Sequence, residues 1–511
     1  MLTSRPEPSP VELHSAAEEQ FNRRRRTTGL WLGPAVFLVL LLLPLPLPPP
    51  AHRLAAIFGL IVVLWVTEAL PVTVTAILGP MAAIVLGVAD ARTALAPFAD
   101  PIIFLFIGSF ILAQAMFVHG LDRRFAYGAL SWPLVGSHPM RILVVYGFVA
   151  AALSMWISNT ATTAMMFPIG LSIVSHLLRT APPDEAARRA IKRYALGLML
   201  ITSFAASIGG MATPVGTPPN LIGIGMLDRI ADVRITFVQW MVLGLPVAAA
   251  LFACLAVGFS LACARGVAAG EGSAMLVRQE LSRLGGLTVA QRNVLIAFGT
   301  TIVLWITPGF FALTGTEASA FATRYAESVP EAVAAVLGAF LLFVLPVDWS
   351  TRRFTLTWDQ AARIDWGIVF LYGGGLAMGS LAFSTGLADA IGRGVTAWLP
   401  SQGTLALTAT FTAVAIILSE TTSNTASANM VVPIAIAVSE AAGVRPIEPA
   451  LGATLGASMG FMMPISTAPN AIVYSSGFIP ITTMMKYGIG LDVVGFFVIV
   501  AVVMLGAPLV F

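Results

Sequence analysis

The chain has 511 residues, of which 57% are hydrophobic and only 10% are charged. Soluble domains carry roughly 25% charged residues, so this composition excludes an ordinary soluble protein and indicates a chain embedded in lipid. The net charge of +3 is small and the basic residues form no nucleic-acid-binding face, so no nucleic-acid partner is expected.

Apolar segments long enough to cross a bilayer follow one another along the chain. A spanning helix needs about 20 mostly apolar residues. Eleven such segments are predicted, at 30–48, 54–70, 72–90, 101–118, 194–226 (interrupted), 237–264, 291–308, 331–347, 366–385, 450–484 (interrupted) and 487–511. Two further apolar stretches, 140–178 and 403–441, are cut in the middle by polar residues. We expect each of these to be a re-entrant hairpin that enters and leaves on one side.

The positive-inside rule orients this arrangement. With the two stretches treated as hairpins, 21 of the 28 Lys and Arg residues fall inside and 7 outside, whereas single spans do not sort the charges. The consecutive arginines at 23–26 then place the N-terminus in the cytoplasm. The odd number of spans places the C-terminus outside. The expected fold is an all-α polytopic protein of the plasma (inner) membrane, with about eleven transmembrane helices and two re-entrant hairpins.

Three motifs recur in the same order in the two halves of the chain. The segment 104–121 is matched by 370–387, the tip sequence Ser-Asn-Thr-Ala at 158–161 by the same sequence at 423–426, and 216–220 by 466–470. An odd number of predicted spans separates the copies, so the second copy enters from the opposite side. Such inverted repeats are typical of secondary transporters, whose sites form near the bilayer midplane where broken helices meet.

The Ser-Asn-Thr tips carry groups for both an anion and a cation. Helix N-termini present free N–H groups to anions, and Asn, Ser and Thr add further donors and acceptors. Prolines in 216–220 and 466–470 free backbone carbonyls, which suit sodium. Ser154 and Ser419 lie one helical turn before the tips and can join each cation site. A single such tip is most often a helix–helix contact, but the paired occurrence favours a site.

Together with 65–71 and the stretch 457–473, these motifs resemble the divalent anion/sodium symporter family over most of the chain. The resemblance implies a homodimer of scaffold and transport domains, in which the transport domain moves like an elevator. It implies import of small dianions with sodium: C4-dicarboxylates such as succinate, citrate, or sulfate. It implies no cofactor apart from the co-transported sodium, and no enzymatic activity. Ser419, where threonine is common in the family, and Ala468, where proline is common, depart from the family pattern.

The resemblance also assigns ligands within these motifs. The substrate is expected to contact Ser158, Asn159, Thr160, Ser423, Asn424, Thr425, Thr217 and Thr467. The first sodium is expected at Ser154, Ser158, Asn159 and Gly216, and the second at Ser419, Ser423, Asn424 and Ser466. No lysine or arginine lies in the motifs, so sodium is the expected counter-charge for a buried dianion.

The predicted division of the chain follows the repeats. It consists of a polar cytoplasmic N-terminus (1–28), scaffold helices (29–139), a first transport half (140–226), further scaffold helices with an amphipathic cytoplasmic segment at 266–290 (227–385), a second transport half (386–486) and a last transmembrane helix (487–511).

Several alternatives remain open at this level. Glu68 and Glu420 are acids in or near spans, which either bind a proton or cation or make helix-end hydrogen bonds. The same fold also serves sodium-independent dicarboxylate exchangers and carriers of sulfate or citrate. An ion channel is the rival from another class. A membrane enzyme is disfavoured because no catalytic constellation is visible.

Overall fold

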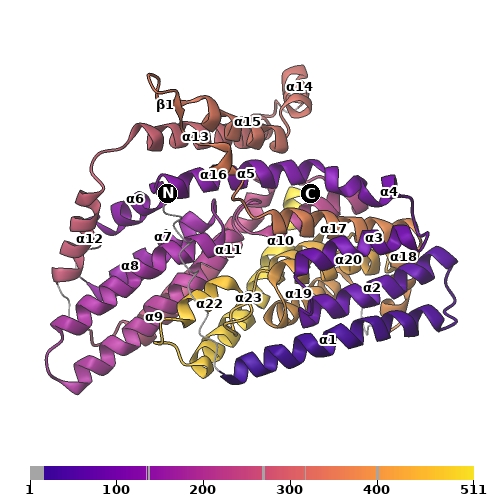
Figure 1. The fold of residues 1–511 in the computed structure, drawn as a ribbon, viewed down its shortest axis with the longest axis horizontal. Helices are drawn as coiled ribbons and strands as arrows, with labels where there is room; N and C mark the ends of the chain where they lie inside the picture. The colour runs from indigo at the N-terminus through magenta and orange to yellow at the C-terminus, as the bar shows by residue number, and fades with distance from the viewer. Residues whose placement is uncertain (1–15, 134, 136–137, 268–270, 317, 399–401) are drawn as a thin grey trace, which may run out of the picture.

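The computed structural model describes residues 16–511 except 134, 136–137, 268–270, 317 and 399–401 (Figure 1). In its first half the elements are α1 (Ala16–Leu42), α2 (Pro49–Thr67), α3 (Val72–Val85), α4 (Ala91–Leu95), the 3-10 helix η1 (Ala96–Ala99), α5 (Pro101–Val118), α6 (Leu121–Leu130), α7 (Pro139–Ser154), α8 (Asn159–Thr180), α9 (Glu185–Gly210), α10 (Pro218–Ala231) and α11 (Phe237–Cys263). The helix α1 thus begins inside the segment predicted as a polar N-terminus, whose first 15 residues lie outside the described part.

The second half is also almost entirely helical, as a chain in lipid requires, because helices satisfy their own backbone groups. Its elements are α12 (Glu271–Arg283), α13 (Val289–Leu313), α14 (Ala320–Ser328), α15 (Glu331–Val344), the short antiparallel strands β1 (Pro346–Asp348) and β2 (Arg353–Phe354), α16 (Trp358–Ala361), α17 (Trp366–Ser384), α18 (Leu387–Thr396), α19 (Thr404–Thr421), α20 (Asn424–Ala441), α21 (Ile447–Gly456), α22 (Ala468–Tyr474) and α23 (Ile481–Val510).

The number of apolar helices agrees with the predicted spans, but their membership differs. Among the described residues, 10 helices are long and apolar enough to cross a membrane, and the pair α14–α15, bent by 63°, brings the number to 11. The ten include the hairpin arms α8 and α19, whereas α3 has only 14 residues and α21 and α22 are short pieces of a broken helix. Apolarity and length therefore do not separate re-entrant arms from spans.

Both interrupted apolar stretches form the predicted helical hairpins. α7 ends at Ser154 and α8 begins at Asn159, while α19 ends at Thr421 and α20 begins at Asn424. The serine of each tip caps the second arm: Ser158 Oγ accepts the Ala161 N–H at 3.2 Å, and Ser423 Oγ accepts the Ala426 N–H at 3.3 Å. An N-cap serine satisfies one of the free N–H groups of the new helix. The polar tip sequence itself thus starts the second arm.

The repeat extends to the turns that follow α5 and α17. Gly120 has φ +64° and Gly386 has φ +81°, and each begins a ten-residue helix, α6 or α18. This left-handed conformation is freely accessible only to glycine. The matched Gly-Leu pairs seen in the sequence therefore mark one structural turn used twice.

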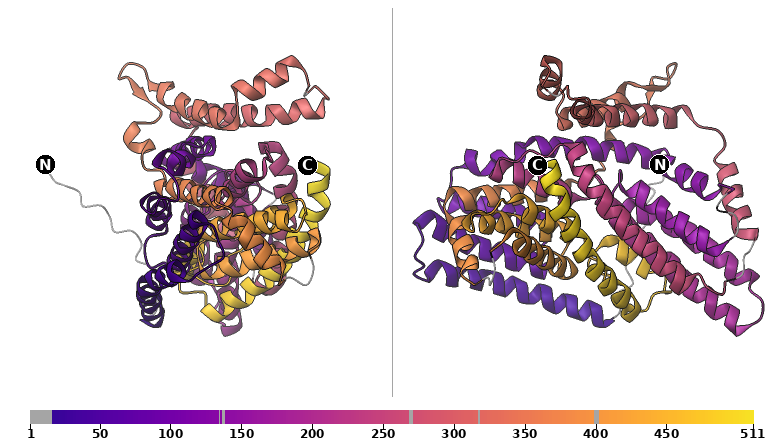
Figure 2. Two further views of the ribbon diagram at one scale, coloured as in Figure 1. Left: turned by 90° about the vertical axis from the view of Figure 1, so that its right-hand side faces the viewer. Right: turned by 180° about the vertical axis from the view of Figure 1, so that it is seen from behind.

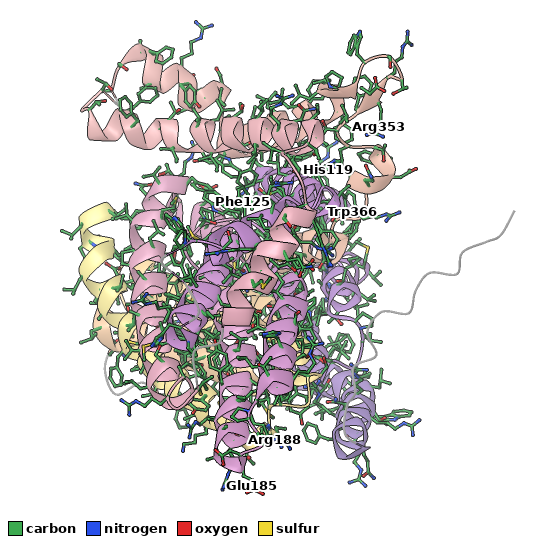
Figure 3. The ribbon with its side chains drawn as sticks, turned by 90° about the vertical axis from the view of Figure 1, so that its left-hand side faces the viewer. His119, Phe125, Glu185, Arg188, Arg353 and Trp366 are labelled. Atoms are coloured by element: carbon green, nitrogen blue, oxygen red, sulfur yellow. The ribbon has the colours of Figure 1, made fainter. Side chains whose placement is uncertain are left out.

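The loops of the predicted inner side contact one another. Arg124 donates to the carbonyls of Leu284, Gly285 and Gly286, and His119 Nε2 lies 2.6 Å from the Thr355 carbonyl oxygen. Figure 3, which views the end of the molecule on the left of Figure 1, shows His119 and Arg353 in the upper part of this end and Glu185 and Arg188 at its bottom. These loops share one end of the bundle.

The loops of the predicted outer side contact one another as well. Arg229 pairs with Asp100 at 2.7 Å, and Arg234 pairs with Glu331 at 3.7 Å. Each pair joins two segments that the positive-inside rule places outside. The two sets of loops therefore separate as the predicted topology requires.

The core of the molecule is a bundle in which the two hairpins pack on the two broken helices. α7 and α8 lie against α9, and α19 and α20 lie against α21. α11 and α23 complete this bundle, since they pack against each other and against α9 and α21 respectively. α13, α14, α15 and the β1–β2 pair form a layer along one side, where α15 packs on α5 (Figure 1, Figure 2).

Candidate functional site

Two buried asparagines shape the breaks between α9 and α10 and between α21 and α22. Asn220 Nδ2 donates to the carbonyl oxygens of Gly210 at 2.9 Å and Thr213 at 2.7 Å. In the second half, Asn470 Nδ2 donates to two carbonyl oxygens at 3.0 Å, ten and seven residues earlier. Both side chains are fully buried. Each asparagine thus satisfies carbonyls that the broken helix leaves free, as an irregular segment at membrane depth requires.

Each hairpin tip is fastened to its own first arm by a serine. Ser154 Oγ donates to Asn159 Oδ1 at 2.7 Å, and Ser419 Oγ donates to Asn424 Oδ1 at 2.7 Å. Both serines are fully buried. The sequence spacing of four and five residues therefore places hydroxyl and amide oxygens side by side in both halves, as predicted.

Glycines allow the tips to touch the breaks. A Cβ atom at Gly460 would lie 2.9 Å from Asn424 Oδ1, and one at Gly210 would overlap Asn159 Oδ1. Gly216 packs in turn against the backbone of Gly210. Only glycine admits this approach. The tip asparagine and the broken helix of each half therefore meet at a point of backbone contact.

A cavity of about 680 Å³ opens between the two tips. Its walls come from both hairpins, both breaks, the later part of α5, and residues 363–368 before and within α17. α8 and α20 begin at this cavity, so their N-termini and free N–H groups face it. α10 begins there as well, but its first two residues, Pro218 and Pro219, carry no N–H group. The cavity therefore offers positive helix ends from opposite repeats to one anion.

Most of the predicted site residues line this cavity. These are Ser158, Asn159, Thr160, Thr217, Ser423, Asn424, Thr425, Ser466 and Thr467. The remaining three, Ser154, Gly216 and Ser419, do not line it but contact the tips and breaks directly behind it. Every residue that the sequence analysis assigned to the substrate and sodium sites therefore lies in or directly behind this cavity.

The donor sets behind the tips suit sodium. They consist of hydroxyl, amide and backbone carbonyl oxygens, which hard cations prefer. Among the described residues no group of three or more His, Cys, Asp and Glu side chains is placed to hold a metal ion. In the second half Ser466 Oγ also donates to the Glu420 carboxylate at 2.7 Å.

The two singled-out acids have distinct partners. Glu68, which ends α2 with φ +47°, forms an ion pair with Arg25 at 2.7 Å. Glu420 accepts hydrogen bonds from the backbone N–H groups of Phe461 at 2.5 Å and Met462 at 2.8 Å. Glu68 thus anchors α1, while Glu420 ties the second hairpin to the second break.

Several cavity residues are not shared between the two halves of the chain. Gln114 on α5 and the exposed Arg363 and Asp365 contribute to the wall opposite the tips. Gln114 lies in the matched segment 104–121 but corresponds to Ser380 in the second copy, and Arg363 and Asp365 lie outside the matched segments, so the repeat did not single them out. Asn220 and Asn470, by contrast, end the matched segments 216–220 and 466–470, and that position was an available signal for their role.

The comparison with protein families decides the relationship. The model of the "Sodium:sulfate symporter transmembrane region" matches residues 24–511. The chain belongs to this symporter family. The family consists of membrane transporters rather than enzymes, which agrees with the absence of any catalytic constellation in the sequence.

Similar family members have been named individually. The chain is 32% identical to "Sodium-dependent dicarboxylate transporter SdcS" of Staphylococcus saprophyticus over 485 residues, which cover 94% of this chain and 91% of that protein. It is also 32% identical to the protein of the same name from Staphylococcus aureus strain USA300, with the same coverage.

Two solved structures resemble the fold at low sequence identity. They are the Alcanivorax borkumensis YdaH transporter, with a TM-score of 0.50, 14% identity and coverage of 89% of this chain and 98% of that one, and Neisseria gonorrhoeae MtrF, with a TM-score of 0.50, 11% identity and coverage of 94% and 96%. At these identities the likeness concerns the fold alone.

Proposed function

We propose that this symporter-family member imports small dianions, foremost C4-dicarboxylates such as succinate, together with sodium. The observation that carries the proposal is the cavity into which Asn159 and Asn424 project from the tips of two inverted hairpins. Each carboxylate of the substrate is assigned to one tip. The N-termini of α8 and α20 stabilise its charge, because their free N–H groups point into the cavity. The name of the SdcS relatives supports both the substrate class and the ion.

Sodium sites behind the tips explain how a dianion binds without a basic side chain in the motifs. We assign one sodium to Ser154, Ser158, Asn159 and Gly216, and the other to Ser419, Ser423, Asn424 and Ser466. Two sodium charges balance the dianion, which would otherwise be costly in a site of low dielectric constant. Sodium also lies next to each tip asparagine, so its binding favours the tip geometry that the substrate needs.

We further propose a moving unit made of α7–α11 and α19–α23, which slides against a frame formed by the other helices. The sequence-based division placed α18 with the second transport half and most of α23 in a segment of its own. The same division placed α11 with the scaffold. We now include it in the moving unit because it packs against α7, α9 and α23. A homodimer, a cytoplasmic N-terminus and an outer C-terminus belong to the same proposal.

Uptake of radiolabelled succinate into proteoliposomes tests the function. An inward sodium gradient is expected to drive accumulation, and choline in place of sodium is expected to abolish it. Equal uptake in both, driven by succinate preloaded inside, would mean a sodium-independent exchanger. Substrate flux that does not saturate, accompanied by ionic conductance, would mean a channel. Parallel assays with citrate and sulfate rank the dianions.

A further inference from the structure

A buried pair of acids lies behind the tip of the second hairpin. Asp492 on α23 and Glu420 on α19 are each 6% exposed, and the two carboxyl groups lie close enough to interact electrostatically. Gly488 and Gly495, on the same face of α23, pack against residues 459–462 of the second break. The pair therefore lies beside Ser419 and Ser466, to which the second sodium is assigned.

The two acids differ in their hydrogen-bond partners. Glu420 accepts from two backbone N–H groups and from the Ser466 hydroxyl. Among the described residues, neither oxygen of Asp492 has a partner, and no ion pair involves either acid. A buried carboxyl group without a donor is costly. A cation held between the two side chains would remove that cost.

The corresponding positions in the first half of the chain carry no acids. Gly244 on α11 packs against residues 211–212 of the first break, as Gly488 packs against residues 461–462 of the second. One helical turn further on, α11 carries Ala248 where α23 carries Asp492. Met155 likewise follows Ser154 where Glu420 follows Ser419. The first half therefore packs in the same way without an acid at either position. Because packing does not require the acids, their presence points to a ligand.

We propose that Asp492 and Glu420 bind one sodium ion in addition to those of the two tip sites, and that this ion is carried with the substrate. The inference rests on the proposed function and extends it. The oxygens on offer are carboxylate, hydroxyl and carbonyl oxygens, the ligands that hard cations take. With two sodium ions balancing the dianion, the acid pair adds buried negative charge beside the second sodium, and a further sodium offsets part of that charge.

Coupling stoichiometry tests this site directly. Purified wild-type protein is reconstituted, and the membrane potential that stops net succinate flux is measured at fixed sodium and succinate gradients. Wild type is expected to couple one sodium ion more than Asp492→Asn does. A wild-type ratio of only two sodium ions per succinate would overturn the proposal without any variant. The proposal would also be overturned if the additional charge carried with succinate depended on the pH gradient instead of the sodium gradient.

Asp122 supplies a matched control. It is 1% exposed on α6, and neither of its carboxylate oxygens has a partner among the described residues. It lies outside both repeats of the site. Asp122→Asn is expected to keep the wild-type coupling ratio, and equal ratios in wild type and Asp492→Asn would contradict the assignment.

Sodium binding to purified protein separates this inference from the proposed function. Sodium that binds the native state raises the stability of the protein. The measurement is therefore the Tm as sodium is titrated against choline at constant ionic strength. Asp492→Asn and Asp492→Ser are expected to lose part of the sodium-dependent rise in Tm that Asp122→Asn retains. An undiminished rise in both Asp492 variants would refute the site even if succinate proved to be the wrong substrate.

Discussion

At the scale of single residues, the site depends on asparagines that serve two kinds of contact. Asn159 and Asn424 accept from a serine behind the cavity and also line the cavity itself. Asn220 and Asn470 donate only to backbone carbonyls of the breaks. The first pair is therefore expected to matter for ligands and the second pair for the shape of the protein.

Replacing a tip asparagine tests the first role. Asn159→Ala and Asn424→Ala each remove a ligand of sodium and of substrate, so sodium-driven uptake is expected to fall at least about tenfold, the factor that corresponds to 1.4 kcal/mol. The measurement is initial uptake per reconstituted protein, with size-exclusion profiles checking the fold. Thr180→Ala, at the exposed end of α8, serves as the control and is expected to transport normally. Wild-type uptake in both asparagine variants would refute the proposed site.

At the scale of elements, close backbone contacts hold the first hairpin on its broken helix. A Cβ atom at Gly209 of α9 would overlap the backbone of Ala151 in α7. Backbone cannot move aside as a side chain can, so the two helices must separate to admit even a methyl group. The hairpin tip would then lose its register against the first break.

Gly209→Ala is accordingly expected to cost about 1–3 kcal/mol of stability and to reduce uptake. Thermal unfolding in detergent and uptake in proteoliposomes measure the two effects. Gly258→Ala, on α11, is the control, because nothing lies within 4 Å of the added Cβ atom. Since alanine is the better helix former, this variant is expected to be neutral or slightly stabilised. Equal behaviour of both variants would show that the contact between α7 and α9 is loose.

The β1–β2 turn provides a test with pH. The hydroxyls of Ser350 and Thr351 and the Ser350 N–H donate to Asp348 and lower the pKa of this carboxyl to about 2. Because the folded pKa is depressed, the stabilisation is complete above the ordinary value of 3.8 and disappears as pH falls through about 2. Asp348→Asn is expected to lower amide protection in the turn at neutral pH, and the difference from wild type should shrink as pH falls through about 2 and vanish below it. A difference that persists there would contradict the assigned cause.

Features that interrupt an apolar stretch with polar residues could be predicted from the sequence. Features that depend on which helices pack together could not. The tips were recognised because Ser158 and Ser423 bring polar residues and an N-cap into apolar segments, twice in the same order. The Glu420–Asp492 pair was not predicted, because Asp492 is a single acid in the apolar stretch 487–511 and only tertiary packing brings it to Glu420. The proposed place of α11 in the moving unit likewise rests on tertiary packing, since hydropathy does not tell which neighbours a span will pack against.

At the scale of the whole molecule, the structure represents one position of the proposed moving unit. The cavity includes the exposed residues Arg363 and Asp365, which lie in the predicted inner loop between the spans 331–347 and 366–385. On the proposed orientation the site therefore opens toward the cytoplasm. The second hairpin contacts α1 and α2 in this position: Arg25 Nη1 donates to the Thr421 carbonyl at 3.1 Å, and Thr422 Oγ1 donates to the Trp65 carbonyl at 3.3 Å.

Arg25 is expected to favour this position over the alternative one. Its guanidinium also pairs with Glu68 at 2.7 Å, and its side chain is only 14% exposed. The positive charge stabilises the carbonyl end of α19, a contact that must break if the hairpin slides along α2. Arg25→Ala should cost this state about 1 kcal/mol, which shifts the equilibrium roughly fivefold toward the outward-facing state.

A cysteine introduced at Ala164, which lines the cavity, reports this shift in a background without Cys254 and Cys263. Membrane-impermeant maleimide added outside should label the Arg25→Ala variant faster than the parent. Arg26→Ala is the matched control, because Arg26 lies 4.0 Å from Glu68, is 58% exposed and should change the labelling rate little. If both variants label at the parent's rate, Arg25 does not hold the second hairpin. If both label equally fast, net charge rather than the Thr421 contact governs the movement.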